Sequence, residues 1–307
     1  MQFVDYKSFW DAKAATTQGA FIAVDGSADE VALRATGSYT ARQVRAALDL
    51  VPGDRVLELG CGVARIGVEL APHVGHWHGV DISANMIEVA RTRLAGHPNT
   101  SLGVLERTAL QGIPDASLDK AYCVAVFIHM DKEDFFLYLR EMRRVLRPGG
   151  RLYFDHWNLA HPVGWRRFQV EADSHAAADP RTRKDVARNQ FCTPQEVEIY
   201  LRQAGLECLA LHGDSPWVQA VATVPEAGAD LAALRAGLQD RAAQYLYSQD
   251  WTRFFDRGMD LIYAHAHPRD VLADIQAAAP SAEREMFLEM VRGFWQVHQG
   301  QFGPMPG

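Results

Sequence analysis

The stretch from Arg55 to Gly67, RVLELGCGVARIG, constrains the fold of this chain more than any other. Its apolar residues Val56, Leu57 and Leu59 are typical of a buried parallel strand, and two glycines separated by one residue follow at once. A helical period begins beyond Gly62, so the glycines mark a strand-to-helix turn. Glycines there let backbone amides approach a ligand beside the positive end of the helix dipole.

A second strand, HWHGVDIS, leads to Asp81. A carboxylate at the carboxyl end of this strand accepts both hydroxyls of a ribose, which an adenosine-containing ligand presents. Arg65 stands where the dinucleotide fingerprint has its third glycine, and the charge of Glu58 suits an ammonium group and would repel a pyrophosphate. These two details favour S-adenosylmethionine over NAD, and an NAD-dependent oxidoreductase is the alternative.

Four motifs together resemble the class I S-adenosylmethionine-dependent methyltransferases over residues 40–223: ELGCG, VDIS with Met86 and Ile87 following, IPDASLDKAY and RRVLRPGGRLYF. The resemblance implies an α/β fold, a Rossmann-like seven-stranded mostly parallel sheet with an antiparallel edge strand. It also implies an enzyme that binds S-adenosyl-L-methionine and methylates oxygen or nitrogen of a small-molecule acceptor by direct in-line transfer. A non-catalytic S-adenosylmethionine-binding or interaction protein of the same fold is a further alternative.

The resemblance assigns cofactor contacts to the glycine turn and the second strand: Glu58, Gly60, Cys61, Gly62, Arg65, Asp81, Ile82 and Met86. Past the third strand, SLGVLE, the family commonly has an acid that binds the adenine amino group. Arg107 and Thr108 occupy that place here, and Glu106 or backbone groups are expected to substitute. Val124, on the fourth strand, is expected to face the methionine portion of the cofactor.

Residues 1–50 have helical periodicity and form a predicted cap ahead of the first strand. In families of this kind such helices often cover the cofactor cleft. Tyr6 and Tyr39 either pack as core aromatics or form a lid over the methionine end of the cofactor, and in the second case Tyr6 is a candidate catalytic residue. Arg42 is then placed to pair with the methionine carboxylate.

Two histidines follow predicted strands at the rim where open α/β sheets bind ligands, His129 after the fourth strand and His156 at the end of the fifth. A base is needed only if the acceptor is a hydroxyl, and these are the two candidates. His129 is alternatively a helix-start cap. His73, His76 and His78 lack a matching set of carboxylates or cysteines, so no metal site is expected.

The chain divides into the cap at 1–50, a cofactor-binding domain at 51–224 and a helical extension at 225–307. Residues 157–190 are polar with little period and are predicted to be a lid insertion. The extension has three apolar helical stripes, which must be buried against the sheet domain, each other or a second subunit, so a homodimer through these helices is conceivable.

Charge and composition argue against some classes of binding partner. A net charge of -7 without a basic block disfavours nucleic acid. No apolar run approaches the ~20 residues that span a bilayer, so membrane insertion is not expected. Four cysteines without CxxC spacing, and an amino terminus without a signal-like segment, indicate a cytoplasmic protein.

Overall fold

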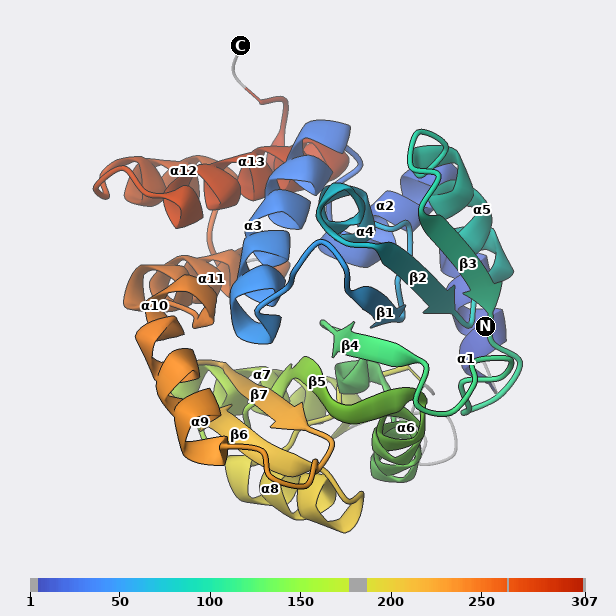
Figure 1. Cartoon of the computed structure of the whole chain (residues 1–307). Coiled ribbons are helices and arrows are strands. Elements are labelled where there is room, and N and C mark those ends of the chain that lie inside the picture. Colours follow the sequence, from blue (N-terminus) through green and yellow to red (C-terminus); the bar gives the residue numbers. More distant parts are fainter. Residues whose placement is uncertain (1–4, 177–186, 264, 306–307) are drawn as a thin grey trace.

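The computed structural model describes residues 5–176, 187–263 and 265–305, and its centre is a seven-stranded sheet (Figure 1). The strands lie in the order β3-β2-β1-β4-β5-β7-β6. Their bounds are β1 Arg55–Leu59, β2 His76–Asp81, β3 Thr100–Val104, β4 Leu118–Cys123, β5 Leu146–Trp157, β6 Glu207–His212 and β7 Trp217–Thr223.

The pairing of the strands confirms the predicted fold class. β1 pairs parallel with β2 and β4, while β7 pairs antiparallel with both β5 and β6. The antiparallel strand β7 is therefore the last but one in the sheet, and β6 is the edge strand. The strand order reverses between β1 and β4, and open sheets of this kind bind ligands at that point, outside the carboxyl ends of the strands.

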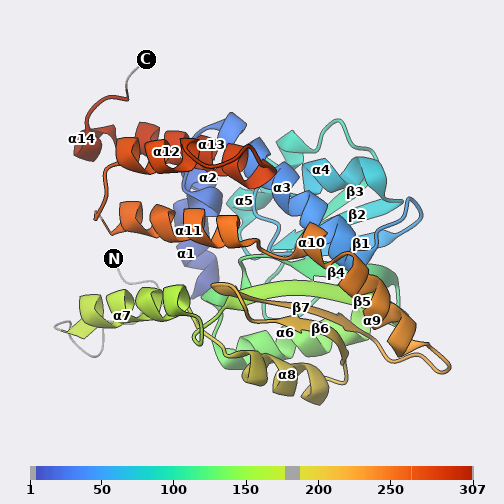
Figure 2. The same ribbon diagram turned by 90° about the vertical axis from the view of Figure 1, so that its left-hand side faces the viewer.

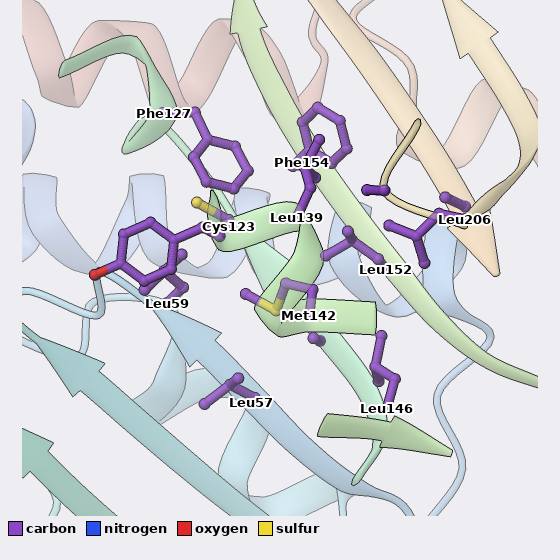
Figure 3. Packing of buried hydrophobic residues seen from close by; sticks show 14 of the residues in the cluster. Leu57, Leu59, Cys123, Phe127, Leu139, Met142, Leu146, Leu152, Phe154 and Leu206 are labelled. Carbon is purple, nitrogen blue, oxygen red and sulfur yellow. The ribbon is translucent and has the colours of Figure 1, made fainter. Parts of the chain in front are cut away.

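Alternate residues of the strands supply two apolar layers. On one face, residues of β1, β4 and β5 pack against α6 (Lys132–Val145) and α8 (Pro194–Gln203). Figure 3 shows this layer, in which Leu139 and Met142 of α6 meet Leu57, Leu152 and Phe154 of the sheet. On the other face, Val56, Tyr122 and Tyr153 pack against residues of α3 (Glu30–Leu48), α4 (Gly67–Leu70) and α5 (Ala84–Arg93). Both faces are thus covered, as the continuous apolar strands require.

The sequence predicts N-caps at Ser83 and at Thr193, with Pro194 at the first helical position, and the structure confirms them. The Ser83 side chain accepts a hydrogen bond from the backbone of Met86 and starts α5. Thr193 forms a capping box with Glu196 at the start of α8, with Pro194 next in the chain. Each cap satisfies amides that have no partner inside the helix. Two short 3₁₀ helices complete the domain, η1 (Ala71–His73) after α4 and η2 (Phe127–His129) after β4.

Residues 157–190 contain a helix that the polar pattern did not predict, α7 (Pro162–Ala176). Its aromatic residues Trp165 and Phe168 are 46% and 37% exposed, so the helix has no buried apolar stripe that would give a helical period. The rest of the predicted insertion includes residues 177–186, which lie outside the described residues. An isolated bridge between Asn158 and Cys192 closes the excursion at its base.

Helices precede and follow the sheet domain as predicted. Before it lie α1 (Tyr6–Lys13), α2 (Thr17–Asp25) and α3. The extension contains α9 (Leu231–Asp240), α10 (Ala242–Tyr245), α11 (Gln249–Ile262), α12 (Pro268–Gln276), α13 (Ala282–Val297) and α14 (Gln299–Phe302). In Figure 1, α13 lies beside α3. None of the described helices has both the length and the apolar run needed to cross a membrane.

A third apolar cluster joins the extension to the sheet domain. It combines Trp157 and Trp217 of the sheet with Trp251 and Phe254 of α11 and Phe287 of α13. The sequence predicts an apolar stripe of α11 made of Phe254, Phe255, Met259 and Ile262, and the first three are buried in this cluster or pack against it. Ile262 is the exception, because its side chain is 56% exposed at the carboxyl end of α11.

Candidate functional site

The glycine turn after β1 has a backbone conformation that favours glycine. Gly60 has φ 70° and Gly62 has φ 50°, both in the left-handed region that favours glycine. The amides of Gly60 and Cys61 donate to the Val80 carbonyl of β2, at 2.8 and 3.0 Å. A Cβ added to Gly60 would lie 2.4 Å from a methyl carbon of Val126. The turn is therefore closed tightly against the end of β4, and only glycine fits there.

Asp81 is held at the end of β2 by two backbone amides. Its Oδ2 accepts from Gly62 and its Oδ1 from Ser83, each at 2.8 Å. Burial raises the pKa of this carboxyl to about 6, although both amide bonds oppose the shift. At neutral pH the group is thus mainly a carboxylate, and each oxygen keeps a lone pair for a further donor.

A cavity of about 380 Å³ opens at the carboxyl ends of β1, β2 and β4. The structure brings together in its lining most of the residues that the sequence proposed: Tyr6, Glu58, Gly60, Cys61, Gly62, Arg65, Asp81, Ile82, Met86, Thr108, Val124 and His129. These residues come from α1, α5, the strand ends and the loops that follow them. The lining is therefore a composite of segments that are far apart in the sequence.

Glu58 is buried at the centre of this lining. Its carboxyl accepts a hydrogen bond from the Tyr122 hydroxyl at 2.5 Å, and that hydroxyl in turn accepts from Trp77 Nε1 at 2.9 Å. Burial raises the pKa of Glu58 to about 8, despite the opposing effects of Tyr122 and the positive charge of Arg65. The group is therefore mostly protonated at neutral pH until a cation comes close to it.

Arg65 lines the cavity beside Glu58 and retains free hydrogen-bonding capacity. Its Nη1 donates to Thr40 Oγ1 at 3.2 Å, whereas its buried Nε has no partner among the described residues. Arg42, which the sequence placed at a ligand carboxylate, lies on the exposed face of α3, 5.7 Å from the Tyr39 ring centre. Within the described lining, Arg65 is thus the better placed guanidinium for an anionic group of a ligand.

The structure does not bring five of the proposed residues into the lining: Tyr39, Arg42, Glu106, Arg107 and His156. Tyr39 is buried between α3 and α13, with its hydroxyl 3.4 Å from Glu283. Glu106 and Arg107 are exposed. His156 is 1% exposed and packs beside Phe135 and Cys192, on the sheet face opposite to that of its neighbour Asp155.

Near Thr108 the cavity has a carboxylate that the sequence did not predict. Thr108 Oγ1 donates to Asp134 Oδ1 at 2.7 Å, and both residues line the cavity. Tyr6 also lines the cavity and contacts the start of α6, because its hydroxyl accepts a hydrogen bond from the backbone amide of Asp131 at 3.1 Å. The acidic residues in the first turn of α6 indicate a helix start. Nothing in the sequence indicated that this turn lies beside Thr108, which follows the third strand.

His129 has a defined tautomer. Its Nδ1 lies 3.0 Å from the Ala187 carbonyl, which accepts only, so Nδ1 carries the proton and Nε2 is left with a lone pair. Burial lowers the pKa of this imidazole to about 4. The ring also makes an edge contact with Trp10 of α1, with centres 5.0 Å apart. His129 is therefore a neutral acceptor fixed in the cavity wall.

The end of the cavity beyond His129 is aromatic. Trp157 and Trp217 stack with their ring centres 4.6 Å apart, and Phe255 of α11 packs against both at 5.6 and 6.0 Å. All three line the cavity, together with Met259 and Ile262. Sequence reasoning had placed the α11 residues in a core stripe, because periodicity shows that a face is apolar and not what covers it.

The loop at the end of β4 is tied to the extension through a buried carboxylate. Ala125 lines the cavity with φ 57°, and its amide donates to Asp155 Oδ1 at 2.7 Å. The Tyr247 hydroxyl, from the segment before α11, donates to Asp155 Oδ2 at 3.1 Å. Asp155 thus holds a strained part of the cavity wall and joins it to residues that lie outside the sheet domain.

Comparison with known proteins gives these observations a context. A family model of a methyltransferase domain matches residues 56–150. A methyltransferase from Streptomyces halstedii is 35% identical over 123 residues, which cover 39% of this chain and 44% of that protein. An O-methyltransferase from Aspergillus nomiae is 34% identical over 116 residues, 36% of this chain and 50% of that protein. The chain spans about half the length of these relatives.

Among solved structures, magnesium protoporphyrin IX methyltransferase from Synechocystis has a similar fold. It matches with a TM-score of 0.53 at 18% identity, covering 71% of this chain and 97% of the other. At that identity the likeness concerns the fold alone.

Proposed function

Because the chain belongs to the class I S-adenosylmethionine-dependent methyltransferases, whose cofactor is S-adenosylmethionine, we propose that it methylates a hydroxyl group of a small molecule. The observation that carries the choice of a hydroxyl is His129 in the cavity wall, whose Nε2 has no hydrogen-bond partner among the described residues. The name of the Aspergillus nomiae relative, an O-methyltransferase, supports the same choice.

The residues of the cavity fit this cofactor. The closed turn at Gly60 and Gly62 lets a ligand approach the backbone, and Asp81 has lone pairs for two ribose hydroxyls. Glu58 would hold the ammonium group, and Arg65 the carboxylate, of the amino-acid portion. The pair Thr108 and Asp134 offers an oxygen acceptor for the adenine amino group.

When bound, S-adenosylmethionine supplies a methyl group that its sulfonium has already activated. The protein therefore has to align the acceptor and exclude water. The aromatic end of the cavity does both, because its stacked rings present a flat apolar wall. Nε2 of His129 takes the proton from the acceptor hydroxyl, while the bond from Nδ1 to Ala187 keeps the ring in orientation.

The experiment measures methyl transfer from labelled S-adenosylmethionine to a panel of phenols and anilines. We expect phenols to be methylated, and we expect His129→Ala and His129→Gln to lower kcat by about 10² to 10⁴, the usual contribution of a positioned base. The affinity for S-adenosylhomocysteine should change little. His73→Ala, an exposed histidine outside the cavity lining, is the matched control.

The pH profile tests the same role independently. Since the pKa of His129 is lowered to about 4, its basic form is present throughout the neutral range. At saturating cofactor and acceptor, kcat should then stay level down to about pH 5 and fall only as the pH passes through about 4. Activity confined to anilines, or full activity of both His129 variants, would exclude histidine-assisted O-methylation.

A further inference from the structure

The aromatic end of the cavity continues outward to the molecular surface. Trp157 contacts Phe191 at 5.9 Å between ring centres, Phe191 contacts Phe168 at 5.5 Å, and Phe168 contacts Trp165 at 5.4 Å. We call these four residues the aromatic track. Its exposure rises along its length, from 4% at Trp157 to 37% at Phe168 and 46% at Trp165.

The outer half of the track is held in place against the extension. In Figure 2, α7 projects from the sheet domain beneath α11. Arg166 of α7 pairs with Asp256 and Asp260 of α11, at 2.6 and 3.0 Å. Arg167 donates to the Tyr263 hydroxyl at 3.2 Å. The two exposed rings are thus presented on an anchored helix, next to the end of α11 where Ile262 lines the cavity and is itself exposed.

We propose that the aromatic track binds a hydrocarbon side chain of the methyl acceptor, whose hydroxyl-bearing ring lies against Trp157 and Trp217. The proposal rests on the proposed function, because it extends the acceptor site of that reaction. Of the four track residues only Trp157 lines the cavity, but Arg167, between the two exposed rings on α7, and the exposed Ile262 line it as well, so the exposed rings adjoin the cavity. Exposed apolar surface beside a cavity marks a place where an apolar ligand is covered, and its position selects the acceptor as the occupant.

The charged residues beside the aromatic track favour a hydrocarbon side chain that carries no charge. Both arginines beside the track are already paired, Arg166 with two aspartates and Arg167 with Glu171 at 2.8 Å. A carboxylate at the far end of the chain would have to compete with these partners. The acceptor class is accordingly a phenolic ring with an alkyl or isoprenoid substituent.

The test uses protein saturated with S-adenosylhomocysteine and a series of probes: para-cresol, para-propylphenol and para-heptylphenol. Calorimetry gives the affinity of each. Since a buried methylene contributes about 0.8 kcal/mol, affinity should rise roughly fourfold for each methylene that the track covers. Trp165→Ser and the double variant Trp165→Ser/Phe168→Ser should lower the affinity for para-heptylphenol at least about tenfold and leave para-cresol unchanged.

Val31→Ser is the matched control, because Val31 is an apolar residue of α3 that is 58% exposed and lies outside the cavity lining. It should leave all three affinities unchanged. Unaltered affinity for para-cresol and for S-adenosylhomocysteine also shows that the serine variants are folded.

Other results overturn the inference. If the affinity does not depend on the length of the alkyl substituent, or depends on it equally in the double variant, the aromatic track is not the site of that substituent. The proposed function would still stand. Binding of none of the phenols rejects the proposed acceptor together with this inference. Self-association, or binding to phosphatidylcholine vesicles, that the double variant abolishes would assign the two rings to a second copy of the chain or to a lipid surface instead.

Discussion

Glu58 should lose a proton when the cofactor binds. Its pKa is about 8 in the ligand-free protein, so the protonated fraction at pH 7 is 10/(10 + 1), or about 0.9. An ammonium group beside the carboxyl favours the charged form and lowers the pKa. Binding of S-adenosylhomocysteine at pH 7 is therefore expected to release up to about 0.9 proton from this residue.

The assay is calorimetry at pH 7 in two buffers of different ionisation enthalpy, phosphate and Tris. The difference in measured heat gives the number of protons released. Glu58→Gln should reduce that number by about 0.9, because the amide keeps the shape of the side chain and has no titrating proton. Methylthioadenosine, which lacks the amino-acid portion, should release no proton from either protein. Equal proton release by the wild type and Glu58→Gln would refute the assignment of Glu58 to the ammonium group.

The same residue should make the stability of the ligand-free protein depend on pH. A raised pKa means that the folded state binds the proton more tightly, so the stabilisation is complete below about pH 4.5 and is lost as the pH rises through about 8. Buried histidines and aspartates also titrate differently in the folded and unfolded states, but their contributions are common to the wild type and Glu58→Gln. The free energy of unfolding of the wild type relative to that of Glu58→Gln should therefore fall by on the order of 1 to 2 kcal/mol between pH 6.5 and 8. A difference that does not change with pH would contradict the raised pKa of Glu58.

Two further predictions concern the ribose site and the extension. Asp81→Ala should weaken the binding of S-adenosylhomocysteine by about 1.5 to 3 kcal/mol, the range for hydrogen bonds to a charged group, and calorimetry showing unchanged affinity would remove Asp81 from the site. Truncation after Val224 should give aggregated or strongly destabilised protein, because it uncovers Trp157 and Trp217 and removes the Tyr245 carbonyl that accepts from Gln43 and Gln219 at 3.0 and 2.8 Å. A soluble truncated monomer with an unchanged melting temperature would contradict the second prediction.

The glycine turn and Asp81, which we propose to bind the cofactor, were readable from the sequence because their determinants are local. The turn from Gly60 to Gly62, the strand before it and the carboxylate at Asp81 occupy fixed positions at strand ends. Parallel strands bring their carboxyl ends to one edge of a sheet, so the order of the motifs is enough to predict that they meet. The caps at Ser83 and Thr193 belong to the same class, since a cap acts within one turn of helix.

The rest of the cavity lining depends on contacts that no local pattern encodes. Asp134 reaches Thr108 from the first turn of another helix, and Phe255 reaches Trp157 from the extension. His129 follows β4 and His156 lies near the end of β5, yet the first lines the cavity and the second is buried on the opposite face of the sheet. The direction of each side chain depends on where its backbone leaves the strand and on what packs against it.

The sequence by itself thus determined the fold class, the cofactor and the glycine turn at the carboxyl end of β1, because strand periodicity and glycine geometry operate over a few residues. Only the tertiary structure decided which histidine lines the cavity, which carboxylates and aromatic rings accompany it, and that α7 and α11 contribute to its wall. Those relations join residues on the order of a hundred positions apart, such as Arg166 and Asp260 or Tyr6 and Asp131. They follow from how the apolar faces of the extension are buried against the sheet domain, which periodicity alone leaves open.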